Sequence, residues 1–569
     1  MINNEKNIEI VVDALKAHGI RHIVISPGGT NICFVKKVQN DPFFHCYSVV
    51  DERSAMYVAI GIYLQTREVV ATSCTSAQAT RNYIPGLTEA FYKRVPILAI
   101  TMEKHNRFKY QEYMQAPDQT SLPEDSVKAT YELPSISDVN DVMHSVRLVN
   151  EAILEVTKHG CGPIQLCIPW LDFQLIDTDV GFRSISRYEY IGEWNISLLN
   201  KKILLVIGEQ LPLSELEQRY FDNFCDVYDV ATYCNHISNC HGDSVINANL
   251  ALSTMKLSEF MRVKPDIVIT MGGQTGDYPL YKLLSRNELS EIEVWRVNQD
   301  GKIVDTYDKL TKVFAVDNTE FFSRTITMAG NQKSNHDYLC SWKEIIKEKT
   351  TDIKVPFSNV YAAKQLSRVL PANSVLQLSI LNSLRVWSLF DIDKTVECYS
   401  NVAAFGIDGG MSTLIGQSMA TEKKCFMVVG DLAFFYDMNS IGIRGLRNNL
   451  RILLVNNNGG IEFKMSANEN KLLDKYIAAG NHFRNAEGWA STCNFKYMKA
   501  SSKEEFDSKM MEFVADSDLP ILFEIFVSDL DEAKAYRMVV ESNTNMSLEE
   551  RAHKTKAALV REMKKVLGK

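Results

Sequence analysis

Short runs of Val, Ile and Leu that end in Gly, Ser, Asp or Asn recur along the chain, separated by longer amphipathic stretches. Continuous apolar runs of this kind are typical of strands buried on both faces of a parallel sheet. The alternation therefore predicts an α/β protein in which central parallel sheets are flanked by helices. Such sheets bind ligands beyond the carboxyl ends of their strands, so the polar residues that follow the runs are candidate functional residues. The clearest runs are residues 22–29, 69–74, 95–101, 202–208, 266–273, 425–431 and 451–458.

The chain is too long for one hydrophobic core, because 569 residues exceed the size at which single cores stop growing. Two polar, irregular stretches divide it, around residues 177–200 and 331–355. We therefore predict three α/β domains, 1–180, 190–335 and 355–540, followed by a charged helical tail, 541–569. The patterns of the first and third domains hint at two copies of one design.

Charge and hydropathy exclude two classes of function. A formal net charge of −8 argues against a protein that binds nucleic acid through phosphate contacts. No run of about 18 apolar residues is present, which argues against a membrane span. The start, MINNEKNIEI, lacks the apolar core of a signal peptide, and the twelve cysteines form no C-x-x-C pair. We expect a cytoplasmic protein with free thiols.

The segment 430–460 carries the strongest chemical signal. One strand ends at Gly430-Asp431, an amphipathic helix is expected next, and a second strand ends in the asparagines and glycines of residues 456–460. A carboxylate, an amide oxygen and a turn carbonyl can supply part of the oxygen shell that Mg²⁺ prefers. The glycines allow the backbone to approach a phosphate closely. The alternative is a helix-capping Asp and an ordinary Asn-Gly turn.

Two further stretches contain candidate functional residues. Residues 400–420 are rich in Gly and run into a helix expected to begin near Ser412-Thr413, whose N-terminus would attract a diphosphate. The alternative is a plain Gly-rich loop. Glu52 follows an apolar approach and precedes an apolar helical run. It is either an exposed acid in the first turn of a helix or a buried carboxyl group that exchanges a proton.

The G-D-x segment, followed after about 25 residues by N-N, resembles the thiamine diphosphate (ThDP) fingerprint of the 2-oxoacid decarboxylase and carboligase superfamily. The resemblance implies a ThDP-binding fold with pyrimidine-binding, middle and diphosphate-binding domains. It implies that Glu52 shares a proton with the aminopyrimidine ring, and that Asp431, Asn457 and the Gly459 carbonyl bind Mg²⁺, with Asn458 as the alternative to Asn457. Ile407 would prop the cofactor in its bent shape. The other implied cofactor contacts are Pro27, Gly28, Thr75, Ser76, Gly409, Gly410, Gly430, Leu432, Ala433, Gly460 and Ile461.

Local matches narrow the resemblance to one branch. They are SPGGTN (26–31), DERSAMY (51–57), residues 72–90, QAPDQ (115–119), GIDGGMST (406–413), GDLAFFYDMN (430–439) and NNNGG (456–460). These are similar to 2-succinyl-5-enolpyruvyl-6-hydroxy-3-cyclohexene-1-carboxylate synthase, the menaquinone-pathway enzyme that adds decarboxylated 2-oxoglutarate to isochorismate. This family implies a homo-oligomer, dimer or tetramer, with active sites between subunits.

Departures from the family pattern lie at the arginines that bind anionic substrates. Thr30, Val402 and Lys104 stand at three arginine positions, residues 272–277 are not basic, and only Arg385 remains. A bidentate arginine contact to a carboxylate is hard to replace with Thr or Val. We therefore expect a rebuilt substrate pocket that suits a hydroxylated acceptor such as a sugar or its nucleotide conjugate. The candidate substrate residues are Thr30, Asn31, Gln78, Lys104, His105, Gln115, Asp277 and Arg385.

The sequence thus predicts a ThDP- and Mg²⁺-dependent enzyme that decarboxylates a small 2-oxoacid. It would then transfer the acyl carbanion equivalent to an unknown acceptor, with a place in sugar or glycan biosynthesis. Three alternatives stay open. They are the menaquinone-pathway synthase itself, a simple decarboxylase of the phosphonopyruvate type, and a ThDP-binding sensor without turnover.

Overall fold

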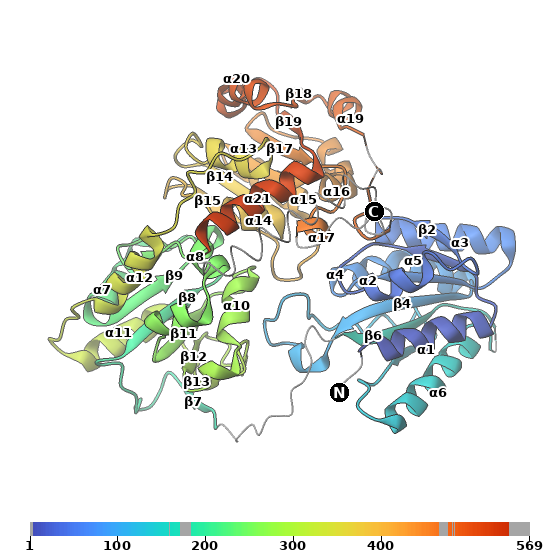
Figure 1. Cartoon of the computed structure of the whole chain (residues 1–569), viewed down its shortest axis with the longest axis horizontal. Coiled ribbons are helices and arrows are strands. Elements are labelled where there is room, and N and C mark those ends of the chain that lie inside the picture. The colour runs from blue at the N-terminus through green and yellow to red at the C-terminus, as the bar shows by residue number, and fades with distance from the viewer. Residues whose placement is uncertain are drawn as a thin grey trace, which may run out of the picture.

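The computed structural model describes residues 4–158, 160–170, 184–465, 476–480, 482 and 484–544. Three parallel sheets, each covered by helices on both faces, form three lobes (Figure 1). The predicted α/β class with parallel sheets is confirmed. The domain limits drawn from sequence stay a prediction, and residues 171–180 and most of the predicted tail lie outside the described residues.

The first sheet has the strand order β2-β1-β3-β4-β6-β5, and all of its pairs are parallel. One face is covered by α1, α2 and α6, and the other by α3 and α5, each with its own apolar cluster. The strands are β1 (His22–Ile25), β2 (His45–Ser48), β3 (Val70–Cys74), β4 (Ile97–Lys104), β5 (Thr130–Glu132) and β6 (Ile164–Trp170). The helices are α1 (Asn4–Ala17), α2 (Ile32–Val38), α3 (Glu52–Thr66), α4 (Gln78–Asn82), α5 (Ile84–Lys93) and α6 (Val139–Glu155), with a 3₁₀ turn at Asn106–Phe108.

The middle sheet has seven strands in the order β10-β9-β8-β11-β12-β13-β7. The strands are β7 (Ser186–Tyr188), β8 (Lys202–Ile207), β9 (Asp229–Tyr233), β10 (Val245–Ile246), β11 (Ile267–Met271), β12 (Glu293–Val297) and β13 (Leu310–Phe314). The helices are α7 (Glu215–Val227), α8 (Asn249–Thr254), α9 (Leu257–Phe260), α10 (Tyr278–Leu284), α11 (Asn318–Ala329) and α12 (Asp337–Lys347). Short 3₁₀ turns lie at His236–Ser238, Met261–Val263 and Asn287–Leu289.

The third sheet has the order β15-β14-β16-β17-β19-β18. If the strands of each sheet are numbered along the chain, the first and third sheets have the same order, 2-1-3-4-6-5. The hint of two copies of one design is therefore confirmed at the level of topology. The strands are β14 (Val375–Leu378), β15 (Glu397–Tyr399), β16 (Cys425–Gly430), β17 (Leu450–Asn456), β18 (Lys496–Ala500) and β19 (Ile521–Phe526). The helices are α13 (Asn359–Leu366), α14 (Asn382–Trp387), α15 (Gly410–Ala420), α16 (Asp431–Tyr436), α17 (Glu462–Met465), α19 (Glu487–Thr492), α20 (Lys503–Val514) and α21 (Asp529–Asn543).

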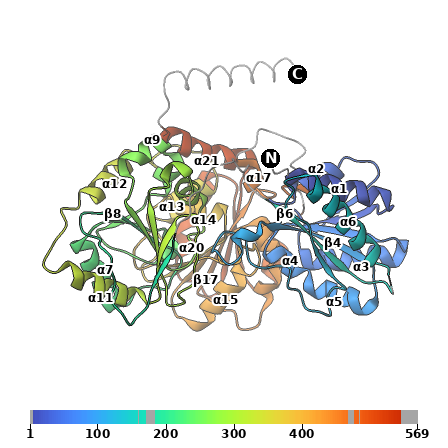
Figure 2. The same cartoon turned by 90° about the horizontal axis from the view of Figure 1, so that it is seen from below.

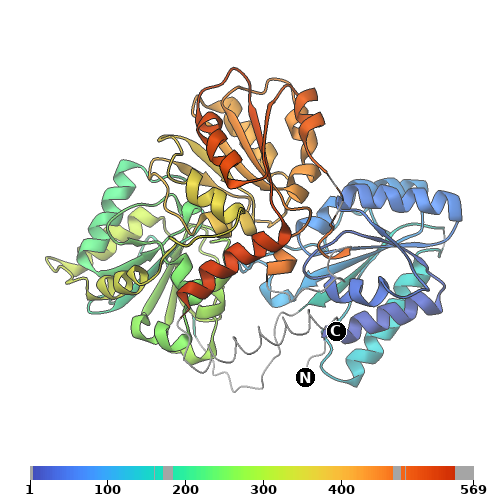
Figure 3. The same ribbon diagram turned by 45° about the horizontal axis from the view of Figure 1, so that its top comes forward.

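Helix α21 ties the third unit to the middle one. It packs against α13 and α17 of the third unit and reaches α8 of the middle unit, crossing the front of the molecule in Figure 3 and its upper edge in Figure 2. Within the described residues, no helix is long and apolar enough to cross a membrane. None of the twelve cysteines, all of which lie in the described part of the chain, forms a disulfide.

One local prediction is wrong. The single amphipathic helix expected after Gly430 is two short pieces, α16 and a 3₁₀ turn at Met438–Gly442. The break falls at Asp437, whose carboxylate accepts hydrogen bonds from the Ser412 backbone N–H (3.0 Å) and from the Ser412 hydroxyl. The backbone of Asp437 leaves the helical conformation (φ −101°, ψ 16°), and its side chain binds the first turn of α15.

Candidate active site

A cavity of about 190 Å³ lies between the first and third sheets, at the carboxyl-terminal ends of their strands. Its walls come from the parts of the chain coloured blue and yellow to orange in Figure 3. This is where open parallel sheets place their ligands. Of the residues predicted from sequence, these line it: Pro27, Gly28, Glu52, Thr75, Ser76, Gln115, Ile407, Gly430, Asp431, Leu432, Ala433, Asn457, Gly459, Gly460 and Ile461. Gly409 and Gly410 lie at the start of α15, outside the lining.

The predicted magnesium ligands meet at one wall of this cavity. Asp431 is 4% exposed, and its carboxylate accepts the backbone N–H of Leu432 (2.7 Å) and of Gly459 (2.8 Å). Burial raises the pKa of Asp431 to about 6. The Oδ1 atom of Asn457 is buried and has no hydrogen-bond partner within the described residues. A buried carboxylate beside an unsatisfied amide oxygen fits a hard cation, which would compensate both.

The three consecutive asparagines have different roles. Asn457 lines the cavity, whereas Asn458 is exposed and lies outside the lining, so the geometry favours Asn457 as the ligand. The Asn456 amide instead donates to Glu524 (2.6 Å) and to the Arg484 carbonyl (3.1 Å), which fixes the end of β17. In the described residues, no group of three or more His, Cys, Asp or Glu could hold a metal. A cation here would therefore be held by one carboxylate and neutral oxygens.

Close backbone approach shapes the opposite wall. A Cβ atom on Gly28 would lie 2.2 Å from the Thr75 Cβ, so only glycine fits there. Thr30 bonds the Thr75 hydroxyl (2.8 Å) and accepts the Ser76 N–H (3.1 Å). The Asn31 amide donates to the Ser26 carbonyl (2.9 Å). Thr30 and Asn31 are buried and lie outside the described lining, where their side chains hold the wall together; the substrate contacts expected of them stay a prediction.

Glu52 is not an exposed first-turn acid. Asp51 caps α3 by accepting the Ser54 N–H (3.1 Å), and this turns the Glu52 side chain inward, where the residue is 7% exposed. Its Oε2 accepts the Tyr436 hydroxyl (2.8 Å) and the Asn82 amide (3.3 Å). Burial raises the pKa of Glu52 to about 7, and nearby Asp408 adds to the increase. A carboxyl group that titrates near neutral pH can both take and return a proton.

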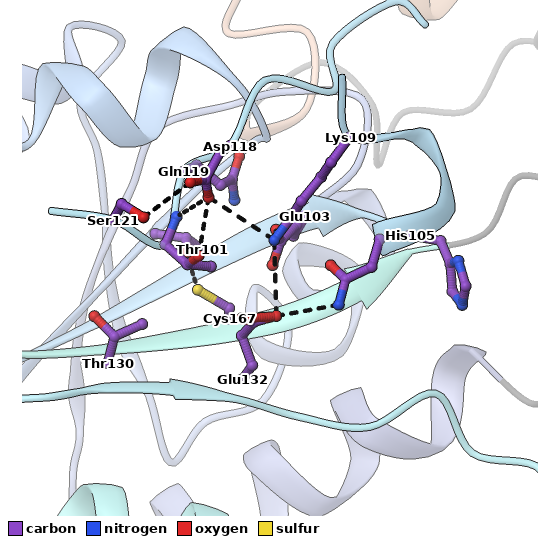
Figure 4. A network of polar contacts seen from close by, with 12 residues as sticks. Thr101, Glu103, His105, Lys109, Asp118, Gln119, Ser121, Thr130, Glu132 and Cys167 are labelled. Atoms are coloured by element: carbon purple, nitrogen blue, oxygen red, sulfur yellow. Dashed lines mark hydrogen bonds and ion pairs between the residues drawn. The ribbon is translucent and has the colours of Figure 1, made fainter. Parts of the chain in front are cut away.

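Gln115 belongs to a loop that is fixed to the first sheet by a polar network (Figure 4). The Gln119 side chain accepts the Ala77 N–H (2.7 Å) and donates to the Met102 carbonyl (2.7 Å). Lys109 forms an ion pair with Glu103 (2.5 Å) and lies near Asp118 and Glu132. Through Ala77, which directly follows Ser76, the same network supports the cavity wall formed after β3. The QAPDQ motif therefore joins one cavity residue to its structural support.

The remaining candidate substrate residues lie outside the cavity lining. Lys104 is buried with its ammonium group over the Tyr113 ring, and His105 caps the 3₁₀ turn by accepting the Arg107 N–H (3.3 Å). Asp277 lines a separate, smaller cavity of about 50 Å³ and accepts the Tyr233 hydroxyl (2.6 Å). Substrate contacts from these residues in the larger cavity are not supported, because their polar groups are used or placed elsewhere. Gln78 donates to the Asn82 side chain (3.4 Å) behind the wall.

Arg385, the one arginine expected to be retained, is paired. Its guanidinium donates to both oxygens of Glu462 at 2.6 and 2.9 Å, and Glu462 itself lines the cavity. Its charge is therefore already neutralised by the protein. The described lining holds four carboxyl groups, Glu52, Asp408, Asp431 and Glu462, and no Lys, Arg or His. Apart from a bound cation and backbone N–H groups, the described lining offers no positive charge to an acidic substrate.

Sequence reasoning missed three residues that contact Glu52 or lie near it: Asn82, Tyr436 and Asp408. Tyr436 and Asp408 stand inside the motifs GDLAFFYDMN and GIDGG, but their spacing from Glu52 along the chain gives no signal of contact. Asn82 lies at the end of a five-residue helix, α4, that follows the β3 turn. A polar residue after a strand end was the only available signal.

Comparison with known proteins agrees with this site. The family model "Thiamine pyrophosphate enzyme, N-terminal TPP binding domain" matches residues 6–122. Similar proteins include the 2-succinyl-5-enolpyruvyl-6-hydroxy-3-cyclohexene-1-carboxylate synthases of Phocaeicola vulgatus, 33% identical over 92% of this chain and 96% of the relative, and of Bacteroides thetaiotaomicron, 32% identical over 94% and 98%. That of Flavobacterium psychrophilum is 28% identical over 91% and 95%. The resemblance drawn from the sequence is confirmed.

Proposed function

Because this chain belongs to the 2-succinyl-5-enolpyruvyl-6-hydroxy-3-cyclohexene-1-carboxylate synthase family of ThDP-dependent enzymes, we propose that it decarboxylates a 2-oxoacid and transfers the remaining acyl unit to an acceptor. One observation carries this proposal. The buried carboxyl group of Glu52 and the Asp431–Asn457 pair line the same cavity, one on each side of the junction between the first and third units.

The residues of this cavity divide the work between binding and proton transfer. Asp431, Asn457 and the Gly459 carbonyl would hold Mg²⁺, and Gly430 and Gly460, which also line the cavity, would allow a diphosphate to approach the backbone closely. ThDP, when bound, supplies the electron sink for loss of CO₂. Glu52 would share a proton with the aminopyrimidine ring, in a site from which burial excludes water.

The acceptor side of the cavity suits a neutral, hydroxylated molecule. Asn382 lines it and donates its amide to Glu532 at 3.0 Å, so its Oδ1 points away from Glu532 and has no hydrogen-bond partner in the described chain. An amide oxygen accepts a hydroxyl donor but repels a carboxylate. With four carboxyl groups and no cationic side chain in the described lining, a neutral sugar fits better than isochorismate. The relatives favour the second candidate, the menaquinone-pathway synthase.

We also propose a cytoplasmic homo-oligomer, dimer or tetramer, with active sites between subunits. In the structure one chain supplies both walls, since Tyr436 of the third unit bonds Glu52 of the first. Two chains that exchange their first units would form the same contacts, because these contacts require only that one first unit meet one third unit.

Release of CO₂ tests this function. The purified protein with ThDP and Mg²⁺ is given pyruvate, 2-oxoglutarate or phosphonopyruvate, with and without isochorismate. Product from 2-oxoglutarate and isochorismate would assign the menaquinone-pathway synthase. CO₂ from another acid, or only after a sugar-like acceptor is added, would support the rebuilt pocket. CO₂ release without ligation in the presence of any acceptor would indicate a simple decarboxylase, and ThDP binding without CO₂ release would indicate a sensor.

A further inference from the structure

The carboxyl group of Glu52 is contacted from both walls of the cavity. The Tyr436 hydroxyl, from α16 of the third unit, donates to its Oε2 at 2.8 Å. The Asn82 amide, from α4 of the first unit, donates both to the same Oε2 at 3.3 Å and to the Tyr436 hydroxyl oxygen at 2.6 Å. Gln78 donates to the Asn82 oxygen, which turns the Asn82 amide hydrogens toward Glu52.

A second acidic group faces this cluster. Asp408, in the Gly-rich turn before α15, lines the same cavity as Glu52 and Asn82. Its charge adds to the effect of burial in raising the pKa of Glu52. In this cluster the Tyr436 hydroxyl stabilises ionised Glu52, and the Asn82 amide bridges Glu52 and Tyr436. The like charge of Asp408 destabilises ionised Glu52.

We propose that Tyr436, Asn82 and Asp408 are positioning residues for Glu52, which hold its carboxyl group at the cavity wall and oppose one another in controlling its proton. This inference rests on the proposed function, in which Glu52 shares a proton with the cofactor. Glu52 and Asn82 come from the first unit and Tyr436 and Asp408 from the third. The carboxyl group therefore acquires this setting only where the two units meet.

The direction of each influence follows from elementary electrostatics. A hydroxyl that donates to a carboxylate favours the charged form, whereas a neighbouring carboxylate disfavours it. The other titratable groups near Glu52 do not reverse the direction of either effect on its pKa. The buried Cys74 thiol and Tyr83 phenol are uncharged at neutral pH, because burial raises the pKa of each. At the start of α3, Asp51 is used in capping and pairs with the largely exposed Arg53.

The test measures hydrogen–deuterium exchange at C2 of bound ThDP by quenched NMR, in the Mg²⁺-loaded enzyme without any 2-oxoacid, as a function of pH. Tyr436→Phe removes the donor and should move the midpoint up by about one pH unit. Asp408→Asn removes the like charge and should move it down by about half a unit. Tyr399→Phe, which loses only a hydroxyl bonded to Glu397, is the matched control and should leave the midpoint unchanged.

A second readout uses the cofactor-free protein. The pH window in which thermal stability falls should move in the same two opposite directions, and neither substitution should move it in a Glu52→Gln background. The inference would be overturned if both variants shifted the pH midpoint in the same direction, or if neither shifted it while ThDP still bound. If Tyr436→Phe does not fold, the shift of Asp408→Asn decides alone. If the wild-type enzyme binds ThDP but does not accelerate C2 exchange, the proposed function fails instead. A wild-type acceleration that Glu52→Gln removes, with both other variants at the wild-type midpoint, refutes only this inference.

Discussion

Glu52→Gln should make the cofactor-free protein more stable at pH 8 while abolishing turnover. Burial raises the pKa of this carboxyl group from 4.5, its ordinary value, to about 7. Between these two values the folded protein binds the proton and the unfolded chain does not, so stability falls as the pH rises through this window. One pKa unit is worth about 1.4 kcal/mol, so the loss amounts to about 3 kcal/mol by pH 8.

Glutamine keeps the shape of the side chain and cannot ionise, so the variant avoids this loss. The difference in free energy of unfolding between Glu52→Gln and wild type should grow by about 2.5 kcal/mol between pH 5 and pH 8. Urea unfolding of both proteins at four pH values measures it, with Glu124→Gln, an exposed position, as the matched control. Calorimetry should show that the variant still binds ThDP, while CO₂ release is lost. A difference that stays constant with pH, or a variant with normal turnover, would refute the reasoning.

Three further outcomes are expected. Glu52→Gln and Asp431→Ala should each be inactive. If the sites lie between subunits, mixing the two variants and allowing their subunits to exchange should restore about a quarter of the activity. No recovery despite demonstrated exchange would place each site within one chain. Asp431→Asn should weaken Mg²⁺-dependent ThDP binding by about tenfold or more in calorimetry, and wild-type affinity would remove Asp431 from the metal site. In a double-mutant cycle of Arg385→Met and Glu462→Met, unfolding should reveal a coupling of about 1 kcal/mol, and the absence of coupling would show that Arg385 is free for substrate.

The fold followed from sequence because its signal is local. A strand buried on both faces must be apolar throughout, so β16 and β17 could be recognised from their own residues. The helix after Gly430 was misjudged because the Asp437 carboxylate binds the first turn of α15, a contact made across 25 residues of sequence. The common strand order of the first and third sheets was equally hidden, since periodicity does not say which strands pair.

That Asp431 and Asn457 lie together was predictable for a related reason. Asp431 and Asn457 follow neighbouring parallel strands, so their proximity is dictated by strand pairing and by motif spacing. The roles of the candidate substrate residues were not predictable, because they depend on which groups their side chains contact in the folded protein. Thr30 and Asn31 look like pocket residues in the sequence but are buried behind the wall. Arg385 looks like a free cation but is neutralised by Glu462.

The sequence by itself thus determined the α/β class, the family and the residues that follow each strand, because apolar periodicity and short motifs are properties of neighbouring residues. Only the tertiary structure decided that the Glu52 carboxyl group is buried and held by Tyr436, which lies 384 positions away along the chain. The proton affinity of a carboxyl group depends on solvent exposure and on nearby charges and donors. These are set by distances in space, and no pattern in the sequence specifies them.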